Sequence, residues 1–143
     1  MVVQWIAKLV AGLIANRRPG EVAAGIAFGL MLALVPPGNL LWVAVLVVTL
    51  FLKLNFGALL AALGVLRLLV PFADPWLDRI GFHILTLEPL APFFTSLYNI
   101  PVIPFFEFNN TIVMGGFISG IVLWLPAFFI ARVAVVLFRN HVQ

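Results

Sequence analysis

The sequence predicts an all-α integral membrane protein. It would have an N-terminal amphipathic helix, a re-entrant helical hairpin broken by Pro-Pro-Gly, and two spanning helices joined by a Pro- and Phe-rich interfacial segment. Of the 143 residues, 64% are hydrophobic and 9% are charged, against about 45–50% and about 25% in soluble domains. The apolar residues form long runs flanked by cations, and a proline pair splits one run. We expect residues 1–143 to form a single membrane domain.

Residues 1–18 predict an interfacial helix. Apolar side chains, Trp5 among them, recur on one side at helical spacing, and the segment ends in Arg17 and Arg18, which suit anionic headgroups. A helix packed on the bundle is the alternative. The basic residues follow the apolar stretch, which is the reverse of a signal peptide, so we expect this segment to stay in the mature protein.

Residues 21–52 predict the hairpin, with its turn at Pro36-Pro37-Gly38. The arms, 21–35 and 39–52, reach only about 21–23 Å each at about 1.5 Å per residue, against a hydrocarbon core of about 30 Å. Both prolines remove backbone donors and disfavour helical geometry in the preceding residue. We therefore expect the hairpin to enter the bilayer and return. Two full spans are the alternative, because the tip carries no charge to oppose them.

Residues 55–73 and 111–138 predict the two spanning helices. Pro71 is expected to end the first, and Pro126 to kink the second. Residues 74–110 contain five prolines and many aromatic residues, a composition typical of the headgroup level. This predicts an interfacial segment that starts with a short helix capped by Asp74.

Six glycines predict helix packing, because small residues let helix backbones approach closely in a membrane. Gly25 and Gly29 form a GxxxG pair that fits close packing of the two hairpin arms. The six are Gly25, Gly29, Gly57, Gly64, Gly116 and Gly120.

The charges predict the topology. In the re-entrant arrangement one side of the membrane holds mostly cations, namely Lys8, Arg17, Arg18, Lys53, Arg132 and Arg139, with Glu21 as the single acid. The other side holds Asp74, Asp78, Arg79, Glu88 and Glu107. By the positive-inside bias both termini are cytoplasmic, which places residues 74–110 on the opposite side, the periplasmic side in a bacterial inner membrane. The net charge of +3 is scattered between apolar runs, so we do not expect nucleic-acid binding.

The sequence has few polar side chains that could converge on a catalytic site, and we expect neither an enzyme nor a metal or cofactor site. The two histidines, His83 and His141, fall on opposite sides of the predicted topology, and a lone interfacial histidine is usually a surface or partner contact. Asp74 and Asp78 lie one helical turn apart, as a general acid and base could, yet nearby arginines offer ordinary ion pairs.

Five residues could contact a lipid headgroup or a partner: Arg67, Asp74, Asp78, Arg79 and Glu107. For Arg67, the plainer alternatives are snorkelling to the interface or pairing with a nearby carboxylate. For Glu107, the plainer alternative is a solvated loop.

The segment from Gly20 to Gly38 carries a family resemblance through Gly25, Phe28, Gly29 and the Pro-Pro-Gly break, followed by an apolar arm that ends in Lys53-Leu54-Asn55. It resembles a family of small bacterial inner-membrane proteins known only as a domain of unknown function, over residues 15–135. Members of one subgroup are encoded beside long envelope proteins that look like bridge-forming lipid carriers. The resemblance implies a partner and no reaction, and it carries over no functional residues.

Two functions remain open. The first is a non-enzymatic inner-membrane subunit that anchors a larger envelope protein and handles membrane lipids, with its hairpin and aromatic segment disturbing the leaflet. The second is a small homo-oligomeric channel or transporter. The scarcity of polar residues inside the apolar runs argues against the second.

Overall fold

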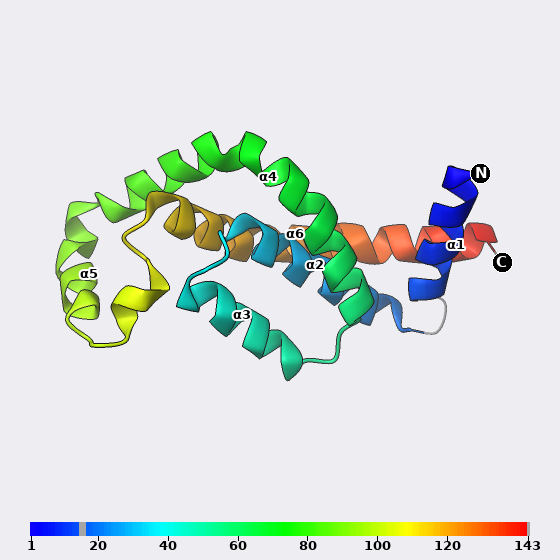
Figure 1. The fold of residues 1–143 in the computed structure, drawn as a ribbon, viewed down its shortest axis with the longest axis horizontal. Coiled ribbons are helices and arrows are strands. Elements are labelled where there is room, and N and C mark those ends of the chain that lie inside the picture. Colours follow the sequence, from blue (N-terminus) through cyan, green and yellow to red (C-terminus); the bar gives the residue numbers. More distant parts are fainter. Residues whose placement is uncertain (15–16, 143) are drawn as a thin grey trace.

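The computed structural model describes residues 1–14 and 17–142, and that part of the chain is helical with no strand. The α-helices are α1 (Val2–Ile14), α2 (Pro19–Leu34), α3 (Leu40–Leu50), α4 (Phe56–Leu85), α5 (Ala91–Tyr98) and α6 (Thr111–Val142), with short 3-10 helices η1 (Glu88–Leu90) and η2 (Ile103–Phe106). We call the end that carries both termini the termini end, and the opposite end the α5 end (Figure 1). The predicted interfacial helix included residues 15 and 16, which lie outside the described residues.

Helix α2 is the centre of the molecule and packs against both α4 and α6 (Figure 1). Val22, Ala23, Ala27 and Leu32 are fully buried, although α2 has only 16 residues. Such a helix is apolar on every side because it is covered on every side. The long helices α4 and α6 thus enclose the short helix α2, and after α2 the chain reverses direction into α3.

Close backbone approaches at glycines fix α2 between its neighbours. A Cβ on Gly29 would lie 2.7 Å from the Leu59 carbonyl oxygen of α4, and one on Gly120 would lie 2.9 Å from the Met31 side chain of α2. A Cβ on Gly25 would overlap the Asn55 carbonyl oxygen, and a Cβ on Gly116 would overlap that of Leu34.

The partner of the GxxxG pair differs from the expectation. Gly25 and Gly29 pack against α4 and not against the second hairpin arm. At this contact α4 has the small residues Ala58 and Ala62, whereas α3 consists mainly of large Leu and Val side chains. Gly64 also differs from the expectation of helix packing, since a Cβ there would meet nothing within 4 Å. For Gly57 the packing role stays a prediction.

The predicted end of the first spanning helix at residue 73 is wrong, because α4 runs through Pro71 and Pro75 to Leu85. The two prolines stand four residues apart, so the hydrogen bonds they remove fall close together along the helix and bend it without ending it. Figure 1 shows α4 as an arch over α2. Asp74 therefore lies inside α4 and caps no new helix.

The arch of α4 is joined to α6 at the α5 end by two glycines. A Cβ on Gly81 would overlap the Thr111 carbonyl, and a Cβ on Gly115 would overlap the Leu77 carbonyl. Sequence reasoning did not single out Gly81. From this point α4 and α6 diverge toward the termini end and leave room for α2.

Among the described residues, two helices, α4 and α6, are long and apolar enough to cross a membrane. In their most apolar 18-residue stretches only 17% and 11% of the residues are buried within the molecule. The core helix of a soluble protein would be mostly buried. Helix α1 runs across the direction of α6 (Figure 1), and its Trp5 and Leu9 side chains are each 66% exposed.

Candidate functional site: the hairpin cap and an apolar groove

The hairpin turn lies between Leu34, the last residue of α2, and Leu40, the first of α3. Val35 already has extended backbone angles (φ −83°, ψ 124°). Gly38 has φ +96°, a value that glycine adopts at little cost and other residues rarely adopt. At about 1.5 Å per residue, the 16 residues of α2 and the 11 of α3 reach about 24 Å and about 17 Å. Each is shorter than a bilayer core of about 30 Å.

The prolines leave two carbonyl groups of α2 without their helical donors. In a continuous helix the N–H groups of residues 36 and 37 would bond to the carbonyls of Leu32 and Ala33, but proline has no N–H. Trp42 Nε1 donates to the Leu32 oxygen at 3.0 Å. Arg67 Nη1 donates to the Ala33 oxygen at 2.8 Å. Side chains from α3 and α4 thus replace the two missing backbone donors.

The position of Arg67 corrects the expectation of a snorkelled or carboxylate-paired arginine. Its half-buried guanidinium points to the C-terminal end of α2, where the helix dipole favours a cation. Of the nearby carboxylates, Asp78 accepts a hydrogen bond from Thr111 Oγ1. Arg67 is therefore held inside the fold, which leaves the headgroup role without geometric support.

Asn39 completes the turn with two hydrogen bonds. Its Nδ2 donates to the Pro36 carbonyl at 2.6 Å, and its Oδ1 accepts from the Trp42 backbone N–H at 2.8 Å as the N-cap of α3. We call Asn39, Trp42 and Arg67 the hairpin cap. Sequence reasoning placed the turn but missed Asn39 and Trp42 as its partners.

The remaining predicted contact residues lie at the α5 end. The Arg79 guanidinium lies over the Trp76 ring, 5.3 Å from its centroid. Glu107 is exposed and adopts a left-handed backbone (φ 57°) at the end of η2, and Asp74 is half-buried within α4.

Two further sets of hydrogen bonds stabilise the loops at the α5 end. Tyr98 donates its hydroxyl to Asn109 Oδ1 at 2.8 Å. Asn110 Oδ1 accepts from the N–H groups of Ile112 and Val113, which caps α6. The polar groups at this end mainly order the loops between α4 and α6.

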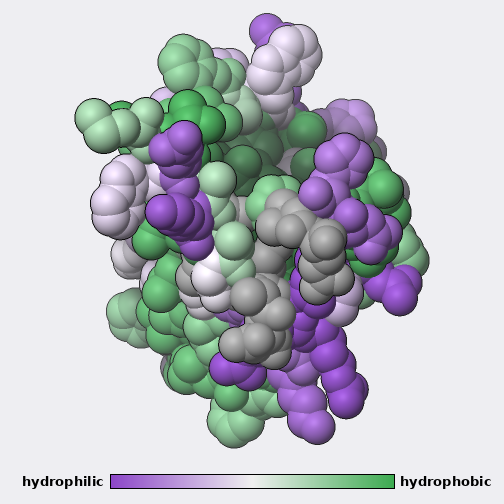
Figure 2. All heavy atoms as spheres, turned by 90° about the vertical axis from the view of Figure 1, so that its right-hand side faces the viewer, coloured by the Kyte–Doolittle hydropathy of each residue, from purple (hydrophilic) through white to green (hydrophobic). Residues whose placement is uncertain are grey.

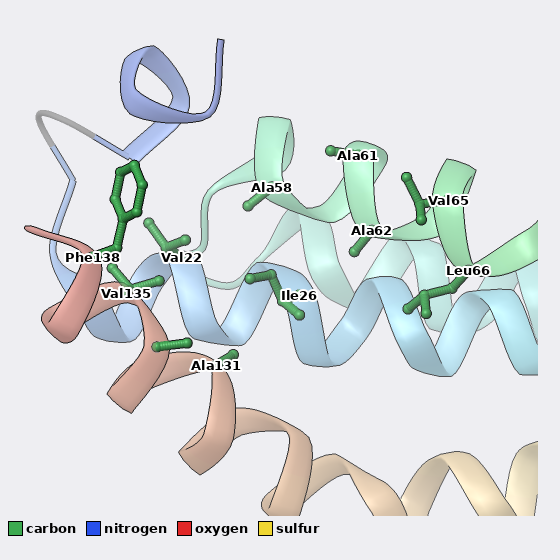
Figure 3. Close-up of a pocket in the computed structure, with 11 residues that line it drawn as sticks. Val22, Ile26, Ala58, Ala61, Ala62, Val65, Leu66, Ala131, Val135 and Phe138 are labelled. Atoms are coloured by element: carbon green, nitrogen blue, oxygen red, sulfur yellow. The ribbon is translucent and has the colours of Figure 1, made fainter. Parts of the chain in front are cut away.

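An apolar groove of about 540 Å³ opens between α2, α4 and α6 toward the termini end. Figure 3 shows α2 as its floor, with α4 and α6 as its walls. All eleven lining residues are apolar: Val22, Ile26, Ala58, Ala61, Ala62, Val65, Leu66, Ala131, Ala134, Val135 and Phe138. Five of them are alanines, so the groove exists because small side chains face the gap between the diverging helices. The sequence shows these alanines but not that three helices bring them together.

The described residues contain no group of three or more His, Asp or Glu side chains placed to hold a metal ion. His83 is exposed on α4, and His141 lies at the far end of α6. The two histidines therefore share no site.

Comparison with known proteins gives one relative. Over 133 residues the chain is 38% identical to an "Uncharacterized protein" of Treponema pallidum (strain Nichols), covering 93% of this chain and 82% of the relative. The two belong to one family. No family model matches the chain, and no solved structure matches it. The relative's description names no ligand, partner or reaction.

Proposed function

We propose that this protein is a non-enzymatic subunit of a bacterial inner membrane that anchors a larger periplasm-facing envelope protein and takes part in phospholipid transport between membranes. The hairpin cap is the observation that carries this choice over a channel. Transporters with broken helices use freed backbone carbonyls to bind ions or substrates. Here Trp42 and Arg67 donate hydrogen bonds to both freed carbonyls. The helix break therefore leaves no free carbonyl of this pair to bind an ion or solute, and we assign it to perturbing the lipid leaflet.

The distribution of charge supports an orientation for this subunit. Lys8, Arg17 and Arg18 precede α2, and Lys53 precedes α4 at the same level, since the Asn55 N–H donates to the Glu21 carbonyl at 2.9 Å. Cations gather on the cytoplasmic side of membrane proteins. The termini end would therefore face the cytoplasm, and the α5 end would face the periplasm.

The α5 end supports a partner contact under this proposal. It exposes large aromatic side chains on the C-terminal part of α4, on α5 and on η2: Trp76 (65%), Phe82 (61%), Phe93 (58%) and Phe105 (69%). Exposed aromatic residues are enriched where proteins bind one another. This surface would hold the envelope partner close to the place where lipid leaves the leaflet.

Copurification tests the proposal. The tagged protein, isolated from native membranes in mild detergent, is expected to bring one long envelope protein with it, identified by mass spectrometry. A Phe93→Ser/Phe105→Ser double variant should recover at least fivefold less of that partner. The control Phe51→Ser changes a residue that is 84% exposed near the start of α4 and should recover as much as the wild type. Recovery of no envelope protein by the wild type would contradict the proposal.

The alternative, a small homo-oligomeric channel or transporter, makes a different prediction for the same preparation. Proteoliposomes that contain this chain alone would then conduct ions or take up solute. The subunit proposal expects neither.

A further inference from the structure

The apolar groove has a positively charged end. Val22 and Phe138 are its lining residues nearest the termini end. Arg18 is the N-cap of α2, one turn before Val22, and Arg139 follows Phe138 and donates through Nη2 to the Arg17 carbonyl. Arg17 and Arg18 precede α2, and their side chains are exposed.

The charge at this end is positive on balance. Glu21 is the acidic residue in the first turn of α2, and it offsets one of the three arginines. Figure 2 looks onto this end and shows hydrophilic side chains gathered among hydrophobic ones. A ligand that fits both features has an apolar chain and an anionic head.

Water and the chain's own N-terminal helix are poor occupants of the groove. A buried water needs two to four polar partners, and the lining side chains are all apolar. Helix α1 does not fill the groove, because its apolar residues Trp5 and Leu9 stay two-thirds exposed. Along α4 the groove runs from Ala58 to Leu66, about 12 Å of helix, which suits part of an extended hydrocarbon chain.

We propose that this groove binds one acyl chain of an anionic phospholipid from the surrounding bilayer, with the phosphate held by Arg17 and Arg18. The inference rests on the proposed membrane function and names the lipid class that the subunit holds. The Arg139 hydrogen bond holds the Arg17 backbone against the end of α6, one residue from the groove-lining Phe138. The volume of about 540 Å³ lies within the range of about 300–1,000 Å³ typical of small-molecule pockets.

The test measures lipid retained by the purified protein. The full chain is reconstituted in vesicles of phosphatidylethanolamine and phosphatidylglycerol (3:1), extracted, exchanged extensively into detergent, and analysed for bound lipid by mass spectrometry. The wild type is expected to retain phosphatidylglycerol in preference to phosphatidylethanolamine. No preference for the anionic lipid would overturn the proposal. Partner copurification is a separate readout, so its failure and the failure of lipid binding can be told apart.

Variants that fill the groove test the acyl-chain site. Ala134→Phe and Ala61→Phe place a ring in the groove from opposite walls at exposed positions, and each should lower retained lipid about tenfold. Val122→Phe changes an α6 residue that is 66% exposed and outside the groove, and it should retain lipid like the wild type. Equal retention in all three variants, or equal loss, would overturn the proposal. Disulfide-linked dimers of Ala134→Cys in membranes would place a second copy in the groove and would also overturn it.

Charge variants test the headgroup contact. Arg17→Gln/Arg18→Gln should lower the preference for phosphatidylglycerol by about fivefold for each arginine removed, because each guanidinium is assigned a direct, charge-assisted hydrogen bond to the phosphate. Lys8→Gln/Lys53→Gln removes the same charge from the same end and should leave the preference unchanged. The same loss in both double variants would indicate non-specific attraction and would overturn the assigned headgroup contact.

Discussion

A Gly81→Ala variant is expected to lose about 3 kcal/mol of unfolding free energy, because the α4–α6 contact at the α5 end leaves no space for a side chain. The added Cβ would overlap the Thr111 carbonyl and lie 2.9 Å from the Gly115 N–H nitrogen. Backbone atoms form this contact from both sides, so no rotamer change relieves the overlap. Overpacking typically costs about 1–3 kcal/mol, and a rigid contact lies at the upper end.

Gly64→Ala is the matched control for this prediction. It lies in the same helix, and its Cβ would meet nothing within 4 Å. Alanine favours a helix over glycine by about 1 kcal/mol, so this variant should be as stable as the wild type or more so. Reversible unfolding in mixed micelles, followed by circular dichroism, compares the two. Equal stability of Gly81→Ala and Gly64→Ala would show that α4 and α6 do not meet as described.

An Arg67→Met variant is expected to lose about 2 kcal/mol, because it leaves the Ala33 carbonyl without a donor. Removing one partner of a buried hydrogen bond costs about 1–3 kcal/mol, and the cost rises where lipid replaces water. Arg67→Lys keeps the charge at the end of α2 but loses the planar guanidinium that reaches Ala33 at 2.8 Å. It should fall between the wild type and Arg67→Met.

The control for this pair is Arg79→Met. Arg79 lies over the exposed ring of Trp76, and its replacement should change stability by less than about 0.5 kcal/mol. The same unfolding measurement applies. An equally small loss of unfolding free energy in Arg67→Met and Arg79→Met would show that Arg67 reaches toward the interface and does not cap the hairpin.

The hairpin turn could be predicted from sequence because its cause is local. The backbone is restricted at Pro36 and Pro37 and is free to adopt a positive φ at Gly38. Helix α2 ends two residues before the first of these prolines. Pro71 and Pro75 obey the same local rule, yet α4 continues past them. The difference is tertiary, because Gly81 and Leu77 meet α6 beyond the prolines and keep that part of the chain helical.

The hairpin cap could be predicted only in part. Each proline identifies the carbonyl it leaves without a donor, so Leu32 and Ala33 follow from the sequence. Their donors do not, because Arg67 is 34 residues from Ala33 and many polar side chains could in principle reach it. The apolar groove was missed for the same reason: Ala61 and Ala134 face one gap only because α4 and α6 diverge from Gly81.

Cysteine accessibility at the hairpin turn tests most directly whether the hairpin returns within the bilayer. The chain has no native cysteine, and Leu40→Cys at the start of α3 leaves the prolines, Gly38 and the hairpin cap unchanged. We expect the thiol to resist membrane-impermeant maleimide from both sides while a permeant maleimide labels it. Lys53→Cys should label from the cytoplasmic side and Asn99→Cys from the periplasmic side. Labelling of Leu40→Cys from the same side as Asn99→Cys would contradict the account and make α2 and α3 two full spans.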